Sequence, residues 1–149
     1  MKLAEALQER ADLNREIAQL QSRLCANAVK QEGQETPEDP EELMEQLERS
    51  VDRLAALTAA INLRNSTVEH EGRTVTELLA QRDALSQKIR ILRELADNAS
   101  AVTHRGLRTE IAMLSAVNVR ELRQKLDLLS KELRLLDNTI QSINWTTEL

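Results

Sequence analysis

The sequence predicts a mainly α-helical fold, an antiparallel four-helix bundle with long helices. Apolar residues recur at steps of three and four along residues 119–143 without a gap, a heptad pattern that is stable only when it is buried against other helices. The 149 residues include no Phe, no Tyr and one Trp, so Leu and Ile must supply the core. Three Gly and two Pro are too few for a turn-rich all-β protein.

The expected organisation is a single four-helix domain over residues 1–149. Apolar spacing predicts helices at about residues 2–29, 40–65, 75–97 and 119–143. Asp39 and Pro40 suit the start of the second helix, Thr74 and Glu77 form a capping box before the third, and Asn118 can cap the last. Helices of similar length with moderate connections favour an up-down-up-down arrangement.

Two connections are expected to contain non-helical structure. Residues 67–75 predict a short β hairpin that turns at Glu71-Gly72. The stretch 98–118 is too long for a structureless loop inside a compact domain. Because Ile111–Val117 has no clean helical period and ends in β-favouring types, a short strand or an ordered extended segment is expected there.

Composition restricts the compartment and the partners. The net charge of −5 and the near absence of aromatic residues argue against nucleic acid as a partner. The first residues include acids where a signal peptide needs an apolar core, and no apolar run is long enough for a membrane-spanning helix. Cys25 is alone, which excludes an internal disulfide and suits a reducing compartment. We therefore expect a cytoplasmic protein without stable membrane insertion, with Cys25 buried beside Leu24 and inert.

No recognised catalytic or metal-binding motif is present. The chain lacks a Glu-x-x-His iron motif, a Gly-rich phosphate loop and a His-x-x-x-His pair. Glu69-His70-Glu71 could touch a metal, but a solvated charged turn is favoured, because neighbouring residues rarely converge on one ion without more distant ligands. We therefore expect a protein that is not an enzyme and that has no cofactor and no metal site.

Some apolar residues lie off the predicted buried faces. Leu128 and Leu135 are seven residues apart on the last helix, and Leu79, Ile91 and Leu95 are off the buried face of the third. Two flanking apolar stripes on neighbouring helices indicate a subunit interface, so we expect a homo-oligomer. The alternative is that these residues only widen the core face.

Two arginines fall on predicted buried faces. Arg10 lies about eight residues into the first helix and Arg82 about seven into the third, so an up-down bundle would place them in one layer. Buried guanidinium groups require acid partners or a bound anion. The residues expected at or near that depth are Thr58, Asn62, Asn65, Glu77, Asp83, Asp137 and Gln141. This polar layer either fixes the pairing of the helices, which is the favoured interpretation, or binds a metal or a small anion.

Several segments are similar to one known family. They are Met1–Leu7, the stretch from Gly72-Arg73-Thr74 to Arg82-Asp83, Leu92–Asp97 and the ending Asn144–Leu149. Together they resemble the septicolysin-like family of small bacterial proteins along the whole chain. The resemblance implies a bacterial helical-bundle protein that forms a homo-oligomer, such as a ring built from dimers, without an established activity.

The family name suggests a pore-forming toxin, which the residues do not support. There is no secretory signal, and the connection at residues 67–76 is too short for two membrane-crossing strands. The sequence therefore favours a structural or interaction protein that assembles with itself. The alternative is a metal- or small-anion-binding protein that uses the polar layer.

Overall fold

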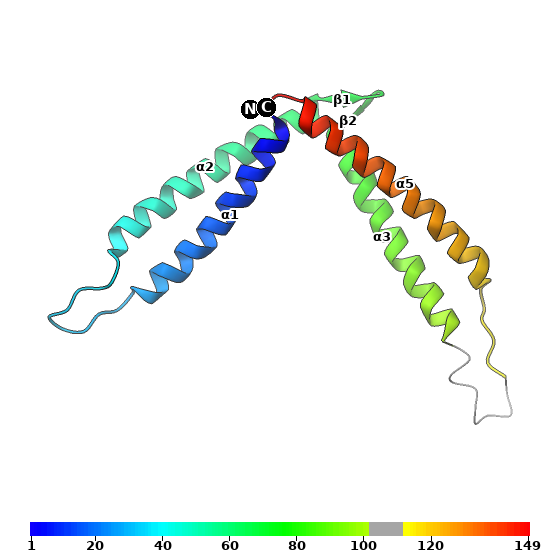
Figure 1. Ribbon diagram of the computed structural model, residues 1–149, viewed down its shortest axis with the longest axis horizontal. Helices are drawn as coiled ribbons and strands as arrows, with labels where there is room; N and C mark the ends of the chain where they lie inside the picture. The colour runs from blue at the N-terminus through cyan, green and yellow to red at the C-terminus, as the bar shows by residue number, and fades with distance from the viewer. Residues whose placement is uncertain (102–111) are drawn as a thin grey trace. The chain divides into compact units, whose positions relative to one another are not determined.

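The computed structural model describes residues 1–101 and 112–149 (Figure 1). The chain is mainly helical, and the described residues contain four long helices and one small antiparallel sheet, as predicted. The helices are α1 (Leu3–Ala26), α2 (Pro40–Thr67), α3 (Val75–Ser100) and α5 (Val119–Thr146), and the strands are β1 (Glu69–His70) and β2 (Arg73–Thr74). None of the helices in the described residues is long and apolar enough to cross a membrane.

The chain divides into two compact units. Unit 1 comprises Met1–Val68 and Ile143–Leu149, and unit 2 comprises Glu69–Ser142. In unit 1, α1 and α2 run antiparallel as a helical hairpin, and in unit 2, α3 and α5 do the same (Figure 1). Each hairpin has its own hydrophobic cluster. The single domain over residues 1–149 stays a prediction.

Local sequence signals fix the ends of the helices. The Asp39 carboxylate accepts a hydrogen bond from the Glu41 N–H at 2.9 Å, and Pro40 occupies the first turn of α2. The Thr74 hydroxyl accepts from the Glu77 N–H at 3.2 Å, while the Glu77 carboxylate accepts from the Thr74 N–H at 2.7 Å. Asn118 accepts from the Glu121 N–H at 3.1 Å. The predicted caps at Asp39, Thr74 and Asn118 are confirmed.

The predicted hairpin at residues 67–75 is also confirmed. Glu69 pairs with Thr74 and His70 with Arg73, so only two residues form the turn. Glu71 and Gly72 both have positive φ, 50° and 76°, which is what a two-residue turn needs to follow the twist of the strands. Glycine takes this conformation without steric cost, whereas at Glu71 it is strained.

Unit 1 is held together by a core and by its paired chain ends. Fully or almost fully buried Leu3, Ala6, Leu57 and Ile61 form the cluster, and Leu7, Leu13 and Leu149 pack against it. The two ends of the chain pair as short extended segments. The Leu3 N–H donates to the Thr147 carbonyl and the Leu149 N–H to the Met1 carbonyl, both at 2.9 Å.

Unit 2 contains most of the heptad pattern of the last helix. Its cluster consists of Leu85, Ile89, Ala96 and Leu126, with Leu92, Leu122, Leu129 and Leu133 packed against them. The regular three-and-four spacing on α5 therefore marks a buried face, as predicted. Each of these two helices has only one partner within the hairpin. The faces of α3 and α5 that point away from this partner are therefore not covered by the hairpin itself.

Two predictions about local structure need correction. Residues 112–117 contain no strand, so the short strand expected for Ile111–Val117 is wrong for its described part, whereas the alternative of an extended segment stays a prediction; Ile111 lies outside the described residues. Cys25 is exposed, not buried. Cys25 directly follows Leu24 in the last turn of α1, so its side chain points about 100° round the helix from that of Leu24. It therefore lies outside the face that packs against α2.

Candidate interaction surfaces

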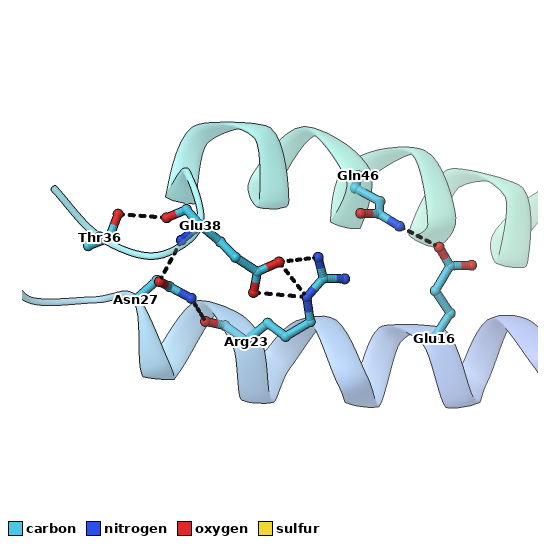
Figure 2. Close-up of polar contacts among 6 residues, drawn as sticks. All are labelled: Glu16, Arg23, Asn27, Thr36, Glu38 and Gln46. Carbon is cyan, nitrogen blue, oxygen red and sulfur yellow. Dashed lines mark hydrogen bonds and ion pairs between the residues drawn. The ribbon is translucent and has the colours of Figure 1, made fainter.

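The tip of the α1–α2 hairpin is organised by side chains at the C-terminal end of α1 and at its cap (Figure 2). The Arg23 guanidinium binds the Glu38 carboxylate, with its Nε 3.1 Å from each carboxylate oxygen. Asn27 is only 4% exposed; its amide donates to the Arg23 carbonyl at 2.9 Å and its oxygen accepts from the Glu38 N–H at 3.0 Å. Thr36 donates to the Glu38 carbonyl at 2.6 Å. The segment before α2 is therefore tied to the end of α1.

Beside this tip lies an open hollow of about 660 Å³. Its lining combines apolar Val29 and Met44 with charged Lys30, Glu35 and Glu41. Lys30 and Glu35 neutralise each other in an ion pair at 3.0 Å. The hollow holds no converging set of unpaired polar groups, so its chemistry favours no particular ligand.

Acid is expected to weaken this tip through Glu38. Hydrogen bonds from Arg23 lower the pKa of the Glu38 carboxyl, against the effect of partial desolvation and with the help of charge attraction. A carboxyl whose pKa is lower in the folded state stabilises that state above its unfolded pKa of about 4.3, and this contribution is lost as the pH falls through the folded pKa. Glu38→Gln should therefore lower the urea midpoint at pH 7, and the gap to wild type should narrow as the pH falls below about 4.

The matched control for this prediction is Glu32→Gln, because Glu32 is exposed and forms no ion pair within residues 1–101 and 112–149. It should leave the urea midpoint unchanged at both pH values. A gap between Glu38→Gln and wild type that stays the same from pH 7 to pH 3 would contradict the assigned role of the Arg23–Glu38 pair.

The residues predicted for the polar layer lie in both units. Unit 1 contains Arg10, Asn62 and Asn65, and unit 2 contains Glu77, Arg82, Asp83 and Asp137. Arg82 and Asp83 are brought together, with guanidinium nitrogens 3.0 and 2.8 Å from one carboxylate oxygen, but their side chains are 35% and 70% exposed. The carboxylate of Glu77 caps α3. A layer that combines both sets stays a prediction.

Two further observations concern these polar residues. Arg10 is partly buried and Asn62 is exposed. The side-chain oxygen of Asn65 is buried and accepts no hydrogen bond from the described residues. No group of three or more His, Cys, Asp or Glu side chains in the described parts of the chain is placed to hold a metal ion.

The residues predicted for an interface are largely uncovered. Ile91 is 50% exposed, Leu95 42%, Leu128 70% and Leu135 54%, whereas Leu79 is partly buried. Leu128 stands two residues after the buried Leu126, which places it about 200° round α5 from the core side. These leucines and Ile91 therefore form an apolar surface that the hairpin itself leaves open.

The opposite side of the same hairpin carries a charged groove that periodicity did not reveal. This groove, of about 590 Å³, has Ile89 and Leu133 among its lining residues, together with Arg90, Arg93 and Arg134. Each of these arginines directly follows a core residue and so flanks the buried face of its helix, which is usual on an amphipathic helix. The sequence has no local signal for this groove, because its three guanidinium groups come together only when α3 and α5 pair antiparallel.

The fold and these surfaces define a class of protein made of two helical hairpins, one of which has an exposed apolar face and an arginine-lined groove. The sequence pattern of a family of unknown function, DUF6847, matches residues 10–149, and the chain belongs to this family. No functionally curated protein matches the chain.

One solved structure is similar over its full length. It is the crystal structure of a functionally unknown conserved protein from Corynebacterium diphtheriae, with 40% sequence identity and a TM-score of 0.93. The match covers 100% of this chain and 98% of the other. At this identity and coverage, the two proteins share their fold.

Proposed function

We propose that this chain is a structural or interaction protein, without enzymatic activity, that assembles with copies of itself through unit 2. The observation that carries the proposal is the exposed apolar surface formed by Ile91, Leu95, Leu128 and Leu135. The septicolysin-like resemblance, which implies a bacterial homo-oligomer, agrees with it. A cytoplasmic location is part of the same proposal and is supported by the single cysteine, which suits a reducing compartment.

The four side chains are placed so that one partner surface could cover them. Leu128 and Leu135 are seven residues apart and so lie on one side of α5, and Ile91 and Leu95 are one turn apart on α3. Leu128 lies two residues before the groove residue Ser130, and Ile91 lies two residues before the groove residue Arg93. Since two residues are about 200° round a helix, the apolar side chains face away from the arginine groove. A second hairpin laid on this side would complete a four-helix bundle between two copies.

The free energy available from this contact is substantial. Full burial of a Leu or Ile side chain contributes about 1.5–3 kcal/mol relative to full exposure. Each copy brings four such side chains that are at least 42% exposed. Two copies together can therefore offset an association cost that starts at roughly 4 kcal/mol. Leu79 is partly buried and lies about 120° or more round α3 from Ile91 and Leu95, so it is outside this contact.

The double substitution Leu128→Glu/Leu135→Glu tests the proposal. Two carboxylates in the centre of an apolar contact cannot be desolvated without a large cost, so association should weaken by at least about 100-fold. Sedimentation velocity at a fixed protein concentration should then show a smaller particle than wild type, with an unchanged helical circular dichroism spectrum.

A matched control replaces two exposed apolar residues of unit 1, Val29→Glu/Leu63→Glu, which are 85% and 68% exposed. This variant has the same change in net charge and should sediment as the wild type does. If the unit 2 variant also sediments like wild type, the apolar surface of α3 and α5 is not the interface and the proposal fails.

A further inference from the structure

The arginine groove of unit 2 contains positive charge without internal compensation. Within the described residues, Arg90, Arg93 and Arg134 form no ion pair and no side-chain hydrogen bond, whereas Arg53, Arg82 and Arg123 each have a carboxylate within 4 Å. The groove also contains Asp137, which forms no ion pair in the described parts of the chain. Three guanidiniums and one carboxylate leave a net charge of +2, so the groove suits a partner with several negative charges.

The bottom of the groove is apolar. Ile89 is 4% exposed and belongs to the core, and Leu133 packs against the same cluster. A partner that fits must therefore present apolar groups beside its acids. A flexible acidic tail has no such pattern, whereas an amphipathic helix has it.

The outer face of α2 has this pattern. Glu41, Glu45, Glu48 and Asp52 follow one another at steps of four, three and four, and all four are exposed. This spacing puts them on one side of the helix, about 180° from the buried Leu43, Ser50, Leu57 and Ile61. Of these four acids, only Glu45 forms an ion pair within the described residues, with Arg49 at 3.7 Å.

Two exposed apolar residues accompany this acidic stripe. Met44 and Val51 are seven residues apart, 48% and 44% exposed, and each is adjacent in sequence to an acid of the stripe. The face of α2 thus offers apolar groups to the bottom of a groove and carboxylates to its rim. Guanidinium and carboxylate groups match each other in bidentate geometry.

The charges of the two units agree with such a contact. Unit 1 contains 8 Lys and Arg against 14 Asp and Glu, a net charge of −6. Unit 2 contains 12 Lys and Arg against 11 Asp and Glu, a net charge of +1, and together they give the −5 of the whole chain. Copies of this chain therefore attract one another most strongly when unit 1 of one copy meets unit 2 of another.

We propose that the acidic outer face of α2 in one copy docks into the arginine groove of a second copy. The inference rests on the proposed self-assembly and adds a second, different contact to it. The apolar contact joins like surfaces, whereas this contact joins two unlike surfaces. A contact of the second kind closes into a ring, of which a reciprocal pair is the smallest, or extends as a filament. Because the groove and the apolar surface lie on opposite sides of the α3–α5 hairpin, each contact joins a different neighbour, so the assembly is larger than a dimer.

The test is a charge exchange. A groove variant, Arg90→Glu/Arg93→Glu, and a stripe variant, Glu45→Arg/Glu48→Arg, should each reduce the mass of the assembly in sedimentation velocity at 50 mM salt. The chain that combines all four substitutions should regain the wild-type mass, because the reversed groups attract each other again. Arg73→Glu/Arg120→Glu, which reverses two exposed charges of unit 2 outside both the groove and the apolar surface, is the control for net charge and should sediment as the wild type does.

Repeating the charge exchange in the Leu128→Glu/Leu135→Glu background separates this contact from the apolar one. The remaining association should be lost above about 0.5 M salt and should respond to the groove and stripe variants. If it does not, the inference fails while the apolar interface can still stand. A groove variant that loses mass without rescue by the stripe variant would overturn α2 as the occupant, as would a 260 nm absorbance of bound nucleic acid that the groove variant removes.

Discussion

Leu57→Ala is expected to lower the free energy of unfolding of unit 1 by about 3–5 kcal/mol. Leu57 is 2% exposed and lies in the cluster with Leu3, Ala6 and Ile61. Truncation removes its transfer free energy and leaves a cavity that two helices joined by a tied-down tip cannot easily close. A unit built from one helical hairpin and the chain ends has few other core residues, so this loss is a large part of its stability.

Leu63→Ala provides the matched control, with the same chemical change six residues further along α2. Leu63 is 68% exposed, so its truncation should change the free energy of unfolding by less than about 0.5 kcal/mol. Trp145 belongs to unit 1 and is the single tryptophan, so its fluorescence in a urea titration reports on this unit. Equal midpoints for the two variants would show that the Leu57 cluster does not hold unit 1 together.

Deletion of residues 147–149 is the second change with a large expected effect. It removes the backbone hydrogen bonds that join Leu3 to Thr147 and Leu149 to Met1, together with the packing of Leu149 on the core. Two backbone hydrogen bonds and one partly buried leucine contribute about 3 kcal/mol together. The deletion also frees the Arg64 guanidinium, whose Nε donates to the Glu148 carbonyl at 2.6 Å.

Glu148→Gln separates the ion pairs of this segment from its backbone pairing. Hydrogen bonds from Lys2 and the N-terminal amine lower the pKa of the Glu148 carboxyl, but the groups are exposed, so the substitution should have a much smaller effect than the deletion. Tryptophan fluorescence during thermal unfolding compares the three chains. A deletion variant that unfolds at the wild-type temperature would contradict the structural role of the paired chain ends.

Much of the helical architecture follows from local signals in the sequence. The heptad pattern of the last helix predicted a buried face, and the capping residues Asp39, Thr74 and Asn118 predicted three helix starts. Two-residue turn geometry at Glu71-Gly72 followed from the residue types there. These signals work because they depend on the backbone within a few residues of each position.

Longer-range organisation was less accessible. A heptad pattern shows that a face is buried but not which helix covers it, so the division into two hairpins with separate clusters could not be derived from periodicity. The pairing of Arg23 with Glu38 spans 15 residues across a loop and leaves no periodic trace. Asn27 is buried although it is polar, and its bonds to the Arg23 carbonyl and the Glu38 N–H satisfy its amide group, which no local sequence pattern predicts.

The candidate surfaces show the same division between local and distant information. Exposure of Ile91, Leu95, Leu128 and Leu135 was predictable, because each lies off the periodic buried face of its own helix. The arginine groove required knowledge that α3 and α5 pair with each other, since its charges come from both. The polar layer around Arg10 and Arg82 depended on one shared bundle register and stays a prediction.

The mass of the wild-type chain in solution tests self-assembly most directly. One chain has a mass of 16.9 kDa, and light scattering across micromolar concentrations should give a defined multiple of this value. The combination of the apolar contact and the acidic stripe predicts a multiple above two at low salt and a smaller one at high salt. A mass of one chain at every concentration and salt would contradict both contacts.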